Sequence, residues 1–358
     1  MKAMEKILEN VMIDSWVRYF SRAPHQINKL HEADAELIEI KGDDSQLLAI
    51  TIDSVAEEIT EGLYQDPFTM GWVTVMSNFS DLAVVGAEPL GIVISVSIEP
   101  TRSKTFCQGI AQGMAAACQK LGVFILGGDT NTTRTISLTG CAIGLVPRDQ
   151  KVTRIGCRVG DVVFLSGSAG SGSAIGLMRL AKLPEEYFPE SSYRPIARIK
   201  EGQLIRNYAT CCMDTSDGVL ATLDQLMRLN GVGFVLEPSP EEFLHPDVWQ
   251  FSKAAQIPAW MMLAGPHGEF ELLFTVPPER VETLLANASL HRWKPIYIGK
   301  VVEEPEIKLK LYDELTTLET GRIRNLFIEV KGNANEYVKE LIRMDAMLGA
   351  NRKITLRV

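Results

Sequence analysis

Residues 123–131 read VFILGGDTN, an apolar run followed by two glycines and an aspartate. We interpret the run as a buried strand that stops at Gly127-Gly128 and presents the Asp129 carboxylate at the C-terminal edge of a sheet. A second strand-like run, residues 47–52, also ends on an acidic side chain, Asp53. The stretch therefore predicts a sheet whose strand ends carry carboxylates.

Length and composition indicate a globular protein of two domains. The chain has 358 residues, of which 46% are hydrophobic, and a formal net charge of -9 at pH 7. Such acidity argues against a nucleic-acid partner, which favours a basic surface. The six cysteines form no Cys-x-x-Cys pair, and we find neither a signal peptide nor a run long enough to cross a membrane. We expect a cytoplasmic protein without a membrane partner.

Helical and strand-like patterns alternate along the chain. The predicted helices span 69–86, 104–121, 219–229 and 335–348, and the predicted strands span 47–52, 92–98, 136–146, 161–165, 270–276 and 297–302. Gly86 and Gly122 are placed to end the first two helices. This alternation predicts an α/β (α+β) fold with an N-terminal domain at 1–150, a C-terminal domain at 151–305 and an extension at 306–358.

Six aspartates lie at strand ends, on a polar helix stripe or in glycine-flanked turns. They are Asp44, Asp53, Asp81, Asp129, Asp214 and Asp217. Asn78 and Asp81 are three residues apart, so both can face one point from a single helix. A cluster of oxygen ligands suits Mg²⁺, which binds substrate phosphates during phosphoryl transfer. The five histidines have no metal-ligand spacing, and Ser-His-Asp chemistry has little support.

The glycine-rich segment 167–176 follows a predicted strand and begins a helix. Three interpretations remain open for it: an anion site at a helix N-terminus, a plain strand-to-helix turn, or a dinucleotide-binding turn. It is not a Walker A loop, because no Gly-Lys-Ser/Thr sequence occurs.

The chain resembles the ATP-binding superfamily of aminoimidazole ribonucleotide synthetase, and within it the thiamine-monophosphate kinases. The matching stretches are GDDSQLL, ITID, MSNFSDLAVVGAEP, ILGGDT, TRIGCRVGDVVFLSGSAGSGSAIGL, MDTSDGV and GEFELLFTV, in that order. The resemblance implies a two-domain PurM-like fold whose N-terminal sheet pairs in a homodimer, with ATP between the domains.

The resemblance also implies individual roles. The Mg²⁺ ligands would be Asp44, Thr51, Asp53, Asp81, Asp129, Asp214 and Asp217, with Asp129 and Asp217 at the catalytic centre. Gly128, Asp129, Arg154 and Ser216 would contact ATP. The implied activity is transfer of the γ-phosphoryl group of ATP to a small acceptor, thiamine monophosphate in the nearest case.

Two departures affect the acceptor side. The kinases have a histidine in a Gly-x-His-Phe context, and its ungapped counterpart here is Thr60. They also have Gly-Gly-Glu-Asp-Tyr-Glu-Leu where this chain has Pro266-His267-Gly268-Glu269-Phe270-Glu271-Leu272, so Glu269 is our candidate for the acceptor-side glutamate.

Three other functions stay open at this point. They are an ATP-dependent synthetase or dehydratase, a nucleotide-binding module without catalysis and, more distantly, a dinucleotide oxidoreductase. The dehydratase's C-terminal cysteine is missing, since the sequence ends Thr355-Leu356-Arg357-Val358.

Overall fold

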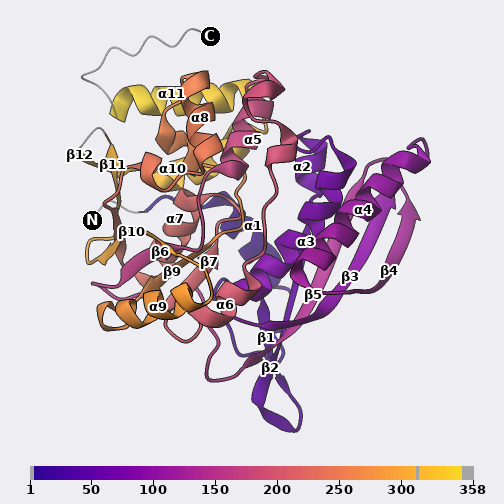
Figure 1. Ribbon diagram of the computed structural model, residues 1–358, viewed down its shortest axis with the longest axis horizontal. Coiled ribbons are helices and arrows are strands. Elements are labelled where there is room, and N and C mark those ends of the chain that lie inside the picture. Colours follow the sequence, from indigo (N-terminus) through magenta and orange to yellow (C-terminus); the bar gives the residue numbers. More distant parts are fainter. Residues whose placement is uncertain (1–3, 312–313, 349–358) are drawn as a thin grey trace.

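The computed structural model describes residues 4–311 and 314–348 and contains two β-sheets with helices packed on them (Figure 1). The C-terminal Thr355 to Val358 lie outside the described residues. Within those residues, no helix is both long enough and apolar enough to cross a membrane.

The N-terminal sheet has five strands in the order β1-β2-β5-β3-β4. Their bounds are β1 Glu36–Ile40, β2 Asp43–Ser54, β3 Glu88–Ile98, β4 Ile125–Thr132 and β5 Ser137–Pro147. All neighbours are antiparallel except β3 and β4, which are parallel. Because α4 connects β3 to β4, this pair forms a crossover unit of the kind that the alternating pattern predicts.

Helices α3 (Pro67–Val84) and α4 (Lys104–Leu121) pack closely against one face of this sheet (Figure 1). Asp66 and Ser103 cap their N-termini, and Gly122 ends α4 in the left-handed conformation. A Cβ added at Gly71 would lie 2.0 Å from the Ile110 carbonyl oxygen, so the two backbones touch at a small residue. The predicted helices and their stops are therefore confirmed.

Strand β4 corrects the interpretation of residues 123–131. It does not stop at the glycines but continues through them, with Asp129 in its interior and not at its end. All eight of its residues are exposed, and Leu126 is 56% exposed. The physical reason is its place at the edge of the sheet, where β3 is its single strand neighbour among the described residues.

The C-terminal sheet has seven strands in the order β12-β11-β8-β10-β6-β9-β7. They are β6 Val162–Leu165, β7 Cys211–Asp214, β8 Gly233–Leu236, β9 Leu272–Val276, β10 Ile296–Val302, β11 Ile307–Leu311 and β12 Glu314–Leu318. Glu271 precedes β9 and is not inside it, and β10 is not the last strand.

The remaining helices belong to the C-terminal half, apart from α2. They are α2 Ala56–Thr60, α5 Ser171–Leu180, α6 Ile199–Ile205, α7 Val219–Asn230, α8 Pro246–Ala255, α9 Pro278–Leu290, α10 Thr320–Glu329 and α11 Ala334–Leu348, with single 3₁₀ turns at Glu185–Tyr187, Glu190–Ser192, Pro240–Glu242 and Ala259–Leu263. Helix α2 comes directly after β2 and contacts β5 of the N-terminal sheet.

Both ends of the described chain pack on the C-terminal half. Helix α1 (Leu8–Val17) is tied to α10 because Asn325 Oδ1 accepts from the Leu8 backbone N–H at 2.9 Å, and Asn325 Nδ2 donates to the Lys6 carbonyl at 2.7 Å. Strands β11 and β12 belong to the C-terminal sheet, although they lie beyond residue 305. The N-terminal residues are thus part of the C-terminal body in space, and the extension begins as sheet.

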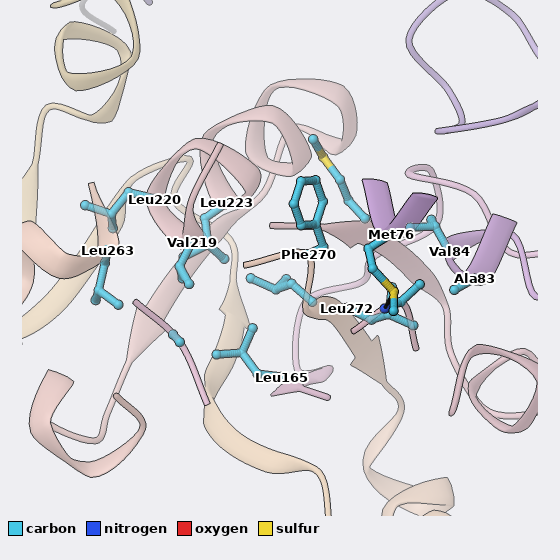
Figure 2. Close-up of a cluster of buried hydrophobic side chains, with 14 of the residues drawn as sticks. Met76, Ala83, Val84, Leu165, Val219, Leu220, Leu223, Leu263, Phe270 and Leu272 are labelled. Atoms are coloured by element: carbon cyan, nitrogen blue, oxygen red, sulfur yellow. Dashed lines mark hydrogen bonds between the residues drawn. The ribbon is translucent and has the colours of Figure 1, made fainter. Parts of the chain in front are cut away.

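One apolar core runs through both halves. Figure 2 shows Met76, Ala83 and Val84 of α3 beside Phe270 and Leu272 of the C-terminal half, and all five are buried. Because α3 carries apolar side chains on several faces, it can pack on its own sheet and on the second domain at once. The helix therefore fixes how the domains meet, and its polar stripe lies at their seam.

Candidate active site at the domain seam

Three carboxylates from distant parts of the chain converge at the seam. Asp34 lies just before β1, Asp81 is on α3 and Asp214 ends β7. One carboxylate oxygen from each lies within 4.8 Å of one from each of the others. Oxygen donors at this spacing suit a hard divalent cation such as Mg²⁺.

Short polar contacts orient the two carboxylates that the sequence had predicted. The Thr51 hydroxyl donates to Asp81 Oδ2 at 2.5 Å, and the Ser80 hydroxyl donates to Asp214 Oδ2 at 2.6 Å. Ser80 is adjacent to Asp81 on α3, so one helix turn holds a carboxylate from each domain. The geometry of the cluster therefore depends on α3 packing against β7.

Asp53 is anchored to the same helix. The side-chain amide of Asn78 accepts from the Asp53 backbone N–H at 3.1 Å and donates to the Asp53 carbonyl at 3.2 Å. Asn78 and Asp81, predicted to face one point, therefore have different partners. Asn78 fixes the end of β2, and Asp81 faces the cluster.

Arg154 lies beside the cluster and bonds Asp34 with two hydrogen bonds. Its Nε and Nη2 atoms each lie 3.0 Å from an Asp34 carboxylate oxygen, and the Asp34 side chain is 1% exposed. A planar guanidinium suits this two-point contact. The residue proposed to contact ATP therefore also holds a carboxylate in place.

Burial and mutual repulsion make the cluster electrostatically costly without a cation. Burial is the largest cause that raises the pKa of Asp81 well above its ordinary value, and the Asp214 and Asp34 charges add to it. Burial, then the charge of Asp34, raises the pKa of Asp214 to about 7. A divalent cation would offset this repulsion, so the donor set fits Mg²⁺.

Asp217 stands on the loop between β7 and α7. Its side chain is exposed to solvent at the wall of a pocket, where the surrounding protein removes part of its hydration; this effect, followed by the charge of Glu9, raises its pKa to about 6. Burial is the main cause that raises the pKa of Asp53, and the charge of Asp217 adds to it, so the two carboxylates are electrostatic neighbours. Ser216 lies beside it, and its backbone N–H is 3.4 Å from Asp214 Oδ1.

Asp44 is not brought to the cluster. It sits at the start of β2, seven residues from Thr51, where its carbonyl accepts from Arg148 at 3.1 Å. At about 3.3 Å per strand residue, the separation is roughly 23 Å, too far for a shared ion. Asp34, which sequence reasoning missed, supplies the carboxylate from this strand pair. The available signal was an aspartate just before the short strand that pairs with β2.

Asp129 also lies apart from the cluster within this chain. In register, Asp53 is beside Gly140, Gly140 is beside Ile94, and Asp129 follows the partner of Ile94 on β4. Three strand spacings of about 4.8 Å place the two aspartates roughly 14 Å apart. Asp129 pairs with exposed Ser95, and its carboxylate accepts from Asn131 at 2.6 Å.

Gly128 has a local structural requirement. A Cβ at this position would lie 2.0 Å from the Ile94 carbonyl oxygen of β3, whereas one at Gly127 would meet nothing within 4 Å. The glycine is therefore needed for the approach of β4 to β3, whatever its relation to a nucleotide.

The structure gives Glu269, the predicted acceptor-side glutamate, internal hydrogen-bond partners. The side chain is buried and accepts from the Gly170 N–H at 2.7 Å and the Thr215 hydroxyl at 2.9 Å. Gly170 is the N-cap of α5, so a carboxylate of the protein itself already occupies this helix N-terminus. The glycine-rich segment is thus a strand-to-helix turn whose helix N-terminus is capped by a buried side chain of the protein itself.

Thr60 is likewise satisfied internally. It ends α2, it is exposed, and its hydroxyl donates to the Ala56 carbonyl at 2.7 Å. Nothing in this geometry directs it toward an acceptor.

The two departures from the family pattern meet in space. Glu58 is the counterpart of the glycine in Gly-x-His-Phe, and its Oε1 lies 4.0 Å from His267 Nδ1. The Tyr64 and Tyr193 hydroxyls both contact His267 Nε2, the latter at 2.6 Å. Burial lowers the pKa of His267 to about 3, so the ring is neutral. At Gly268, a Cβ would lie 1.5 Å from the Thr215 carbonyl oxygen, so no side chain can replace the family's glutamate there.

Comparison with known proteins places this chain in a family. The model of the AIR synthase related protein N-terminal domain matches residues 32–146, and that of the C-terminal domain matches residues 158–312. A thiamine-monophosphate kinase of Archaeoglobus fulgidus is 32% identical over 233 residues, which cover 64% of this chain and 74% of that protein. The chain belongs to the thiamine-monophosphate kinase family. The predicted class, an ATP-dependent phosphotransferase, is thereby confirmed.

Solved structures support the fold of this kinase family member. AaThiL complexed with AMPPCP and TMP superimposes with a TM-score of 0.69 at 24% identity, over 88% of this chain and 99% of that chain. The hydrogenase maturation protein HypE of E. coli gives 0.64 at 20% identity, over 87% and 96%. At these identities both show the fold alone, so the predicted two-domain α/β architecture is confirmed and the structural likeness to HypE carries no activity.

Proposed function

We propose that this protein transfers the γ-phosphoryl group of Mg²⁺-ATP to thiamine monophosphate, giving thiamine diphosphate and ADP. The observation that carries the proposal is the convergence of Asp34, Asp81 and Asp214 at the domain seam. Such a cluster needs both domains, as does a nucleotide bound between them.

The proposed roles follow from the contacts. Asp34, Asp81 and Asp214, with Asp53 close by, would hold Mg²⁺, which neutralises charge on the phosphates during transfer. Thr51 and Ser80 orient two of these carboxylates. Arg154 would face the phosphates while bonding Asp34, and Ser216 and Asp217 would border the transferred group. Catalysis then rests on positioning and charge, with no covalent enzyme intermediate.

We further propose that the active form is a homodimer. Helices α3 and α4 cover one face of the N-terminal sheet, while Ile52, Leu90, Val93 and Leu126 are exposed on its strands. Apolar side chains gathered on one sheet are typical of an interface. Asp129 and Gly128 lie in this exposed region, about 14 Å from Asp53 of the same protomer. Pairing of the sheets would allow the partner's Asp129 to complete the site.

The direct test is to incubate the purified chain with Mg²⁺-ATP and thiamine monophosphate and to analyse the products by mass spectrometry. We expect thiamine diphosphate and ADP in equal amounts. Asp214→Asn should abolish the product, whereas Asp149→Asn, on an exposed turn, serves as the matched control. Release of ADP and free phosphate without thiamine diphosphate would contradict the proposal.

A further inference from the structure

A groove of about 340 Å³ lies beside an open edge of the C-terminal sheet. Strand β12 forms that edge, at the periphery of this half of the molecule, and β11 is its single strand neighbour among the described residues (Figure 1). The groove lies between the end of β12 and helices α10 and α11, and its apolar walls are Trp260, Leu318, Ile323, Met344, Met347 and Leu348. An open strand edge next to an apolar groove can accept a further strand.

The two faces of β12 have different surroundings. Leu318 pairs with Ile307 of β11, and both side chains are buried, so their face looks into the protein. Leu315 lies on the opposite face and is 56% exposed. Because side chains alternate between the faces of a strand, a strand added at this edge needs an apolar side chain at every second position.

The sequence that follows α11 has this alternation. Residues 349–358, here called the C-terminal tail, come after the described part of the chain and read GANRKITLRV. Apolar side chains stand at 354, 356 and 358, and polar ones at 353, 355 and 357. A period of two over six residues is typical of a strand with one buried face. Its length also matches β12, which has five residues.

Charge and position favour the same pairing. The tail carries Arg352, Lys353 and Arg357 and no acidic residue, whereas Glu314 and Glu319 stand at the two ends of β12. Opposite charges on neighbouring strands stabilise a pair. The last turn of α11 lines the groove together with the C-terminal end of β12, so the tail starts next to the edge that it would cover.

We propose that residues 353–358 of the chain's own C-terminal tail bind the edge of β12 as an antiparallel strand. Because α11 ends beside the C-terminal end of β12, the added strand runs back along β12 in the opposite direction. Ile354 then lies opposite Leu318, and Leu356 lies opposite Thr316. Both apolar side chains face the groove, and the backbone of β12 gains partners for the hydrogen-bonding groups that an edge exposes.

Residues 349–352 form the connection between helix and strand. They include Gly349 and Asn351, two residue types that favour turns and helix ends. Four residues reach at most about 13 Å, which is enough to reverse direction beside an adjacent strand end. The proposal does not depend on phosphoryl transfer, since neither ATP nor the acceptor takes part in it.

Hydrogen exchange of the β12 amides, followed by mass spectrometry on the full chain, tests whether the edge is covered. Leu356→Lys places a charge on the face that meets the groove, and Thr355→Lys, one position along, places the same charge on the outer face. We expect peptides that contain residues 314–318 to exchange roughly tenfold faster in Leu356→Lys than in the wild type, and at the wild-type rate in Thr355→Lys.

The comparison of these two variants decides the assignment of faces. Equal exchange in the wild type and both variants would show that the tail does not cover β12, and the proposal would be wrong. Faster exchange in Thr355→Lys than in Leu356→Lys would also overturn it, because the apolar side chains would then face outward.

Cross-linking tests the register and identifies the occupant. In the proposed register Thr355 lies opposite Thr317, so the double variant Thr317→Cys/Thr355→Cys should form a disulfide within one chain when treated with oxidised glutathione. Leu315→Cys/Thr355→Cys is the control, since its cysteines are two positions out of register and too far apart to bond. Peptide mapping and non-reducing electrophoresis report the bond. A disulfide that joins two chains would assign the edge to the tail of a second copy and contradict the proposal.

Discussion

At the domain seam, Asp81 and Asp214 meet in space as the family pattern implies, whereas on the acceptor side Thr60 and Glu269 make only internal hydrogen bonds. The seam is assembled from elements that the core holds in place, chiefly α3 and β7. The residues predicted for the acceptor side lie on the short helix α2 and on the loop before β9. The structure therefore brings the predicted metal ligands Asp81 and Asp214 together, but does not bring Thr60 and Glu269 to a common site.

The largest expected effect is a difference in activity between variants of Asp34 and Asp44. Asp34→Asn should lower kcat/KM for ATP roughly a hundredfold or more, because it removes a carboxylate from the cluster and a partner from Arg154. Asp44→Asn should stay within roughly twofold of wild type, since it lies at the far end of β2. Steady-state kinetics over a Mg²⁺ titration measures both, with melting temperatures to detect unfolding. A loss confined to Asp44→Asn would invert the geometric assignment.

The next effect tests whether the seam is complete in one protomer. Val93→Asp places a charge on the exposed face of the N-terminal sheet. We expect the variant to be monomeric and to keep at most roughly a tenth of the wild-type activity. Light scattering with size-exclusion chromatography reports the mass, and product formation reports the activity. Leu285→Asp, on the exposed part of α9, is the matched control. A fully active monomer would show that Asp129 of the same chain, or no Asp129, suffices.

A smaller effect concerns stability and Glu269. Burial raises the pKa of Glu269 from 4.5 to about 8, so the native state binds more protons than the unfolded state between these values. The free energy of unfolding therefore falls as pH rises through this window. Glu269→Gln has no proton to lose, and its melting temperature should decline less between pH 6 and 8, by about 3 °C. Its KM for the acceptor should be unchanged. A large rise in that KM would restore Glu269 to the acceptor site.

The smallest effect is expected at Thr60. Thr60→Ala removes a hydroxyl that bonds its own helix, so kcat/KM for thiamine monophosphate should change by no more than about twofold. Glu57→Gln provides the comparison, because Glu57 is on the same helix and lines the pocket beside Asp217. If Thr60→Ala proves the more damaging of the two, the acceptor approaches α2 from its exposed end.

Much of the fold was predictable because its elements carry strong local signals. The helix 104–121 has a serine cap, a regular apolar stripe and a terminal glycine, and the structure has it at the same residues. The strand at 123–131 was misjudged in burial, because an apolar run looks the same whether it lies at the centre of a sheet or at its edge. Neighbours in the sheet, set by residues elsewhere in the chain, decide between these cases.

The site divides along the same line. By itself, the sequence determined that aspartates stand at the ends of strands, that a buried helix carries a polar stripe, and to which family the chain belongs. Tertiary structure alone decided which carboxylates meet: Asp34 joined Asp81 and Asp214, while Asp44 and Asp129 remained apart. The physical reason is that ligand convergence depends on strand register and on the end of the strand a residue occupies. The same motif spacing is compatible with a carboxylate at either end of a strand. Only the packing of α3 against both sheets decides which strand ends meet.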